Sequence, residues 1–179
     1  IWDVATGKLI RKLTIGKRVF QATYSPNGNL VAVASADRNL KLYDASSWRQ
    51  VRAFPGHQQG SFTVAFSPDG SRLVGGSRDH TIHVWDVKRG NSIVRLQGHG
   101  YPVTCVAFSP DGERIVSGSA DSTVRLWATD SGLLTLALPK LKSHWTQCVG
   151  FSPDGSKIVC ASQEPTIRIW DALPTATKR

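Results

Sequence analysis

The sequence predicts an all-β protein, a β-propeller built from four-stranded antiparallel blades, with about four blades in the chain. A Ser-Pro-Asp-Gly or Ser-Pro-Asn-Gly turn recurs at intervals of 42, 42 and 43 residues, beginning at Ser25, Ser67, Ser109 and Ser152. An aromatic residue recurs with nearly the same period, at Trp2, Tyr43, Trp85, Trp127 and Trp170. No segment of useful length has helical periodicity. Short strands repeating about every 42 residues are typical of propeller blades.

Each repeat contains four strand-like segments in a fixed order, which residues 98–140 illustrate. An apolar segment, VTCVAFS, precedes the Pro-Asp-Gly turn, in which Pro presets φ and Gly accepts a positive φ. A second segment, RIVSGS, leads to a turn that contains Asp121. The third, TVRLW, alternates β-branched and polar residues. LLTLAL follows as an outer strand, so the repeat predicts one antiparallel four-stranded blade.

The same pattern divides the whole chain into repeats. Residues 1–13 are predicted to be the end of a preceding repeat with its outer strand. The four repeats that follow are 14–55, 56–97, 98–140 and 141–179.

Composition and charge exclude several function classes. The net charge is +9, with 22 basic and 13 acidic residues, and most acidic residues occupy repeated turn and strand-end positions. The surface that the repeats leave free is therefore basic, which favours acidic partners, RNA included. No apolar run approaches the ~18 residues of a membrane span. Phosphate-binding loops and HExxH motifs are absent, so we expect no enzyme activity, no metal and no cofactor.

The three cysteines, Cys105, Cys148 and Cys160, lie in apolar segments without metal-ligand spacing. They are predicted to be buried free thiols in a reducing compartment, which indicates an intracellular protein, cytoplasmic or nuclear.

The chain resembles the WD40-repeat family over its whole length. Gly-His occurs at 56–57 and 98–99, and Trp-Asp at 2–3, 85–86 and 170–171. The resemblance implies a propeller that usually has seven or eight blades. We therefore expect these four repeats to belong to a larger ring whose remaining blades are partners. A closed four-bladed ring and a ring made from two chains stay open as alternatives.

Two repeats carry a set of residues that imitates a catalytic triad. Ser, His and Asp together suggest a hydrolase, but an active site is built once, whereas this set occurs twice with a Trp at a fixed offset. The resemblance implies a structural chain instead, in which Trp donates to Ser, Ser bonds His, and His bonds Asp. The two sets are His57, Ser77, Asp79 and Trp85, and His99, Ser119, Asp121 and Trp127. The flanking repeats break the set, with Ile15 and Lys142 at the His position.

The resemblance also indicates where partners bind. Loops before the first strand and after the second lie on one rim of the ring, which is the usual binding face of the family. Arg, Tyr and Trp dominate interface energies, so those in these loops are the candidates. The predicted partner-binding residues are Lys17, Arg18, Arg78, Tyr101, His144 and Trp145.

Three functions remain compatible with the sequence. The first is a non-catalytic scaffold that assembles a complex of proteins or peptides through its rim loops. The second is a ribonucleoprotein or nucleolar assembly factor that contacts RNA through its basic surface. The third is the sensor region of a larger regulatory protein or of a ubiquitin-ligase substrate receptor.

Overall fold

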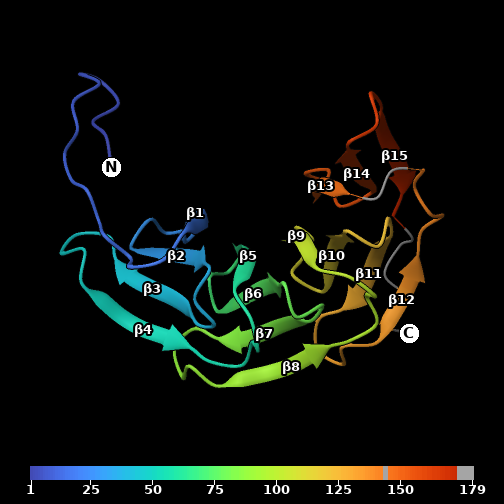
Figure 1. Cartoon of the computed structure of the whole chain (residues 1–179), viewed down its shortest axis with the longest axis horizontal. Coiled ribbons are helices and arrows are strands. Elements are labelled where there is room, and N and C mark those ends of the chain that lie inside the picture. The colour runs from blue at the N-terminus through green and yellow to red at the C-terminus, as the bar shows by residue number, and fades with distance from the viewer. Residues whose placement is uncertain (143–144, 173–179) are drawn as a thin grey trace.

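The computed structural model describes residues 1–142 and 145–172, and all regular elements in this part of the chain are strands. They form four antiparallel sheets that lie side by side around an open arc (Figure 1). We call each sheet a blade and number the blades in chain order. The predicted all-β, blade-type fold is confirmed, and the sheets do not close into a full ring.

Each blade uses consecutive strands in the order of the chain. Blade 1 contains β1 (Val19–Tyr24), β2 (Leu30–Ser35), β3 (Leu40–Asp44) and β4 (Gln50–Phe54). Blade 2 contains β5 (Ser61–Phe66), β6 (Arg72–Ser77), β7 (Ile82–Asp86) and β8 (Ser92–Leu96). Blade 3 contains β9 (Val103–Phe108), β10 (Arg114–Ser119), β11 (Val124–Ala128) and β12 (Leu134–Ala137). Blade 4 contains β13 (Thr146–Phe151), β14 (Lys157–Ser162) and β15 (Ile167–Asp171).

A Ser-Pro-Asp-Gly turn, or Ser-Pro-Asn-Gly in blade 1, joins the first two strands of every blade. In blade 2, the Gly70 amide donates to the Ser67 carbonyl, and Gly70 has a φ of 72° that a Cβ would strain. The Ser67 hydroxyl donates to Asp69, as does that of Ser71. These two hydrogen bonds lower the pKa of Asp69 to about 2. The turn is thus closed by its own side chains, which explains why the motif recurs.

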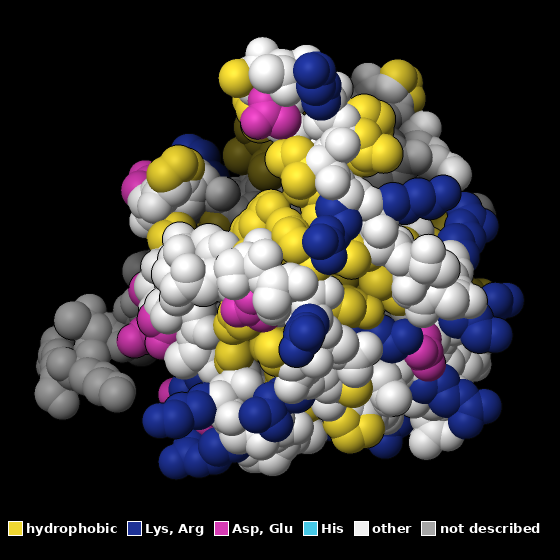
Figure 2. All heavy atoms as spheres, turned by 90° about the vertical axis from the view of Figure 1, so that its left-hand side faces the viewer, with side chains coloured by type: hydrophobic (Ala, Val, Ile, Leu, Met, Phe, Trp, Pro, Cys, Tyr) yellow, Lys and Arg dark blue, Asp and Glu magenta, His cyan; other side chains and the backbone are white. Residues whose placement is uncertain are grey.

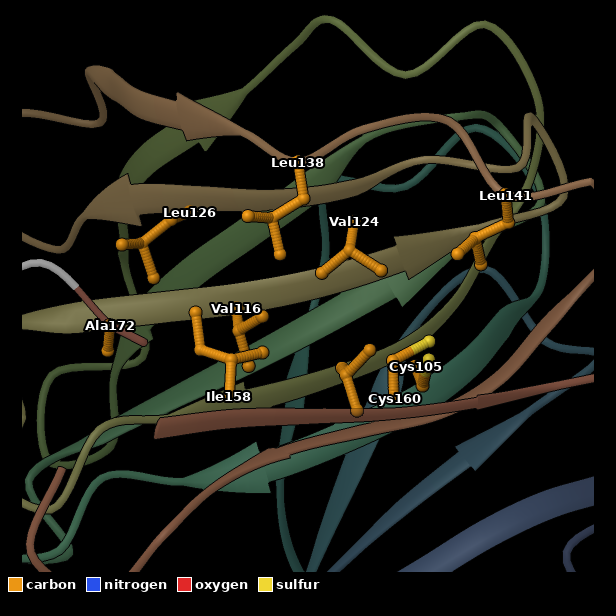
Figure 3. Close-up of a cluster of buried hydrophobic side chains, with 10 residues drawn as sticks. Cys105, Val116, Val124, Leu126, Leu138, Leu141, Ile158, Cys160 and Ala172 are labelled. Atoms are coloured by element: carbon orange, nitrogen blue, oxygen red, sulfur yellow. The ribbon is translucent and has the colours of Figure 1, made fainter. Parts of the chain in front are cut away.

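The core lies between the blades. Each interior face packs against the next sheet, and the largest fully buried side chains are Trp85 and Trp127. Figure 3 shows the cluster between blades 3 and 4, where Val116 and Leu126 meet Ile158. Cys105 and Cys160 are buried there as free thiols, as predicted. Cys148 is a free thiol but exposed, because its side chain falls on the outer face of the last blade, so its predicted burial is wrong.

The end face of blade 4 is open, whereas the apolar residues on the end face of blade 1 are buried. On blade 4, Ile167 and Ile169 are 70% and 63% exposed. On blade 1, Val31, Val33 and Tyr43 form a small cluster with Trp48. Figure 2 shows hydrophobic side chains gathered on this side of the molecule, with Lys and Arg around them. These faces match the ones that interior blades bury, because the repeats place apolar residues on both faces.

The first thirteen residues fold as an irregular hairpin. Trp2 forms an isolated antiparallel bridge with Leu9. The same register pairs the third and fourth strands elsewhere: Tyr43 with Gln50, Trp85 with Ser92, and Trp127 with Leu134. The segment therefore keeps the hairpin register of a blade's last two strands.

Candidate functional site

In blade 3 the triad-like residues form a closed hydrogen-bond chain. The Trp127 indole donates to Ser117 Oγ over 2.8 Å. Ser117 Oγ lies 2.8 Å from His99 Nε2, and His99 Nδ1 lies 2.9 Å from Asp121 Oδ2. Because Ser117 accepts from the indole, its hydroxyl proton is free for His99, which leaves the Nδ1 proton for Asp121. These hydrogen bonds join β11 and β10 to the loop before the first strand, which carries His99, and to the turn after the second strand, which carries Asp121.

The serine in this chain is Ser117 and not Ser119, which corrects the sequence prediction. Ile115 pairs with Trp127 across β10 and β11, so Ser117 is one diagonal step from the indole and Ser119 is two. Ser119 instead accepts the Asp121 amide and donates to the Tyr101 carbonyl. It closes the turn after the second strand and ties that turn to the preceding loop.

Blade 2 lacks the complete chain that the sequence predicted for it. Gly75 occupies the position of Ser117, and the Trp85 indole donates to the Pro55 carbonyl instead. His57 Nδ1 stays 3.3 Å from Asp79 Oδ2, but its Nε2 is buried without a hydrogen-bond partner. Ser77 has the same role as Ser119, accepting the Asp79 amide. Two of the three predicted contacts, Trp–Ser and Ser–His, are therefore absent here.

A second buried histidine explains the difference in blade 2. His83 lies at the position of Arg125, with its ring 4.7 Å from that of His57 and 5.5 Å from that of Trp85, measured between centroids. Neither nitrogen of His83 has a hydrogen-bond partner. Burial, together with the charges of His57 and Arg95, lowers the pKa of His83 to about 4. It is therefore neutral at physiological pH.

The flanking blades, which have no histidine at this position, neutralise the turn acid by another route. In blade 1, Lys41 Nζ lies 2.9 Å from Asp37, and in blade 4, Arg168 lies 2.7 Å from Glu164. Lys41 and Arg168 occupy the position that His83 and Arg125 fill in the middle blades. A basic side chain thus faces the turn acid in every blade: a histidine in the middle blades, and Lys41 or Arg168 in the flanking ones.

The triad-like residues cannot act on a substrate. Ser117 has no exposed surface, its oxygen is engaged by Trp127 and His99, and the His99 side chain is 1% exposed. Burial raises the pKa of Asp121, but hydrogen bonds from His99 and Thr123 lower it by more than burial raises it. The net pKa is lowered, so the carboxylate stays ionised. A nucleophile must be accessible, so this geometry serves to hold strands and loops together.

The loops at this end of every blade are tied together in the same way. The carbonyls of the residues before the first strand accept the amides of the residues that follow the second strand. These pairs are Arg18 with Ala36, Gly60 with Arg78, Pro102 with Ala120, and Trp145 with Gln163. The loops so joined form one rim of the arc. The turns at the other end form the opposite rim, where in blade 3 the Thr129 amide donates to the Glu113 carbonyl.

A pocket of about 450 Å³ opens on this rim, and all four blades contribute to it. We call it the rim pocket. Phe20 and Phe62 meet edge to face, with ring centroids 4.8 Å apart, and the Arg18 guanidinium lies 5.2 Å from the Phe20 centroid. The lining residues are Arg18, Phe20, Phe62, Thr104, Trp145 and Gln147. Phe20, Phe62, Thr104 and Gln147 hold equivalent positions in blades 1 to 4.

The structure brings together only two of the residues predicted to bind partners, Arg18 and Trp145. Tyr101 is exposed and stacks on His80, with centroids 6.1 Å apart. Arg78 and Lys17 are exposed on the same rim, outside the lining of the rim pocket. His144 lies outside the described residues.

Sequence reasoning missed Phe20 and Phe62, although a signal was present. These two aromatic residues align with Thr104 and Gln147 in the repeats. Because the residue at this position varies from aromatic to polar among otherwise regular repeats, an aromatic side chain there is not needed to form a blade. Comparing the repeats column by column would have marked it.

Residues 1–142 and 145–172 contain neither a candidate metal site nor a candidate membrane span. No three His, Cys, Asp or Glu side chains are grouped so that they could hold a metal ion. No helix long and apolar enough to cross a membrane is present there.

Comparison with known proteins gives one match over most of the chain. The family described as "WD domain, G-beta repeat" matches residues 7–44, 48–86, 90–128 and 137–171.

Several curated proteins are similar to this chain over about one repeat. A ribosome biogenesis protein WDR12 homolog of Drosophila mojavensis is 40% identical over 45 residues. The corresponding protein of Drosophila willistoni is 41% identical over 44 residues. The matched stretch is 25% of this chain and 11% or 10% of those proteins, so this chain covers only a small part of their length.

Proposed function

Because this chain belongs to the WD40-repeat family, we propose that it is a non-catalytic scaffold that holds other proteins through the rim pocket and the loops around it. Members of the family are typically non-catalytic and bind proteins.

The observation that carries the proposal is the exposure of aromatic side chains where four blades meet. Phe20 and Trp145 are 37% and 41% exposed, although the neighbouring strands bury most of their apolar residues. Exposed aromatic surface costs ~25 cal/mol per Å² relative to burial, so it is retained where a partner covers it. Arg18 beside these rings adds a residue type that is enriched at interface hot spots.

Site-specific photocrosslinking tests the proposal. A photoreactive phenylalanine analogue at Trp145 in the full chain is expected to crosslink to discrete proteins in cells. The matched control carries the same group at Leu133, which is 67% exposed on the opposite rim. Crosslinks that form equally at Leu133 would contradict binding through this rim.

A second candidate is an assembly factor of a ribonucleoprotein particle. Two observations favour it: the net charge of +9 and the partial similarity to ribosome biogenesis proteins. Such a role would place the protein in the nucleus. Binding to an RNA oligonucleotide at two salt concentrations tests it, since several phosphate contacts give a steep loss of affinity with salt. Weak binding with a shallow slope would favour the scaffold.

A further inference from the structure

We infer that the rim pocket takes an apolar side chain of an acidic peptide segment, with glutamate or aspartate residues flanking the apolar one. The inference rests on the proposed scaffold function and specifies the chemistry of its partner. It follows from the pocket lining and from the distribution of charge on the rim.

The pocket lining suits an apolar anchor. The Phe20 and Phe62 rings contact each other edge to face and form one wall, and Trp145 contributes a third ring. Thr104 and Gln147 supply polar groups beside these rings. A volume of about 450 Å³ accommodates a leucine or phenylalanine side chain and part of its backbone.

Arg18 sets the sign of the ligand's charge. Its guanidinium lies over the Phe20 ring, 5.2 Å from the centroid, so it is held at the pocket by a cation–π contact. A second cation would be repelled there, whereas a carboxylate could take both outer N–H groups of the fork. The position therefore disfavours lysine or arginine as the residue that enters the pocket.

The acidic side chains of the rim are not free to pair with Arg18, because each already faces a basic side chain of its own blade. Asp37 pairs with Lys41, Asp79 with His57, Asp121 with His99, and Glu164 with Arg168. By contrast, no ion pair within residues 1–142 and 145–172 involves Lys17, Arg18, Arg38 or Arg78. The rim therefore presents unpaired positive charge around an apolar pocket, which complements an acidic segment with an apolar centre.

RNA fits this surface less well. Single-stranded bases stack on aromatic faces that are open to solvent and aligned along a charged groove. Here Phe20 is covered on one side by Arg18 and on another by the edge contact with Phe62. One concave pocket with one cation at its side matches a single anchoring side chain.

Fluorescence anisotropy with defined probes tests the inference on the full chain. The main probe is a labelled peptide with one central leucine flanked by glutamates. Three comparison probes replace the glutamates by lysines, replace the leucine by serine, or are a uridine oligonucleotide. We expect the main probe to bind most tightly, and Arg18→Glu and Trp145→Ala each to weaken it about tenfold or more. Leu133→Ala, the matched control, should leave the affinity unchanged.

The possible results distinguish a failure of the acidic-segment inference from a failure of the scaffold proposal. Equal binding of the lysine peptide, or loss of affinity with salt that follows the oligonucleotide, would overturn the acidic-segment inference. No rim-dependent binding of the leucine peptide would also overturn it. If crosslinks from Trp145 to cellular proteins persist in that case, the scaffold function stands and only the partner chemistry is wrong. If those crosslinks are absent too, both are wrong.

Discussion

The imidazole rings of His57 and His83 lie 4.7 Å apart between centroids, and neither ring is hydrogen bonded to the other. A Cβ on Gly56 would lie 2.8 Å from His83 Nδ1, so the loop above closes directly over this pair. In blade 3 the same space holds Arg125 near Gly98. The substitution of a titratable ring for a permanent cation makes blade 2 the acid-sensitive blade.

We expect acidification to destabilise the fold through His83. Its pKa is lowered to about 4 in the folded state, against about 6.5 when unfolded, so the unfolded state takes up a proton first. The stability from neutral His83 is fully present above pH 6.5 and is lost as pH falls toward 4. Between pH 7 and pH 5 the free energy of unfolding should drop by up to about 2 kcal/mol more in the native chain than in His83→Gln. Urea titrations measure this, and identical pH profiles would refute it.

Ser117→Ala should destabilise the protein by about 1–3 kcal/mol, because it orphans the Trp127 indole and His99 Nε2 in a buried site. The indole fluorescence of Trp127 should shift in the folded state, since its hydrogen bond is lost. Ser119→Ala should leave that fluorescence unchanged, because Ser119 bonds only the turn and the Tyr101 carbonyl. A shift with Ser119→Ala, and none with Ser117→Ala, would instead show that Ser119 bonds the Trp127 indole.

Gly75→Ser should not rebuild the missing chain in blade 2. A Cβ there would lie 2.7 Å from Leu40 Cδ1 and 3.0 Å from a Trp85 ring carbon, so the substitution crowds a packed core. We expect a loss of about 1–3 kcal/mol by chemical denaturation. Combining Gly75→Ser with Leu40→Ala should cost less than the sum of the two single changes, because the smaller side chain relieves the clash. A single Gly75→Ser variant that is more stable than the native chain would contradict this packing.

Lys41→Ala should cost only about 0.5–1 kcal/mol, because its ion pair with Asp37 is partly exposed to solvent. The pKa of Asp37, lowered first by its hydrogen bond with Lys41, should rise toward its ordinary value in the variant. NMR titration of the Asp37 carboxyl measures that shift. An unchanged pKa would mean that Lys41 does not neutralise the turn acid.

The blade architecture was predictable, whereas the details of the site were not. Turn chemistry at Ser67 and Gly70 repeats in the sequence, so the strands and their order follow from it. The serine assignment failed because Ser119 and its counterparts recur in all four repeats for a different reason, namely closing the turn. Ser117 has no serine counterpart, since Val33, Gly75 and Cys160 fill its column. Residues that recur in every repeat therefore indicate contacts that all blades share, whereas a contact made in a single blade leaves no repeated pattern in the sequence.

The rim pocket was half predictable for a related reason. Residue type and loop position were enough to select Arg18 and Trp145. The adjacent Phe20 and Phe62 lie within first strands, where an aromatic residue is expected to be core. That these rings line a pocket shared by four blades depends on how the sheets pack against one another.

The most direct test separates the buried chain from the rim pocket by measuring stability and peptide binding on the same two variants. His99→Ala should lower the free energy of unfolding by about 1–3 kcal/mol while the folded protein keeps its affinity for the leucine–glutamate peptide. Trp145→Ala should do the reverse, weakening the peptide about tenfold with an unchanged unfolding midpoint. Lost binding in a fully stable His99→Ala variant, with Trp145→Ala unaffected, would contradict the assignment of structure to the one and binding to the other.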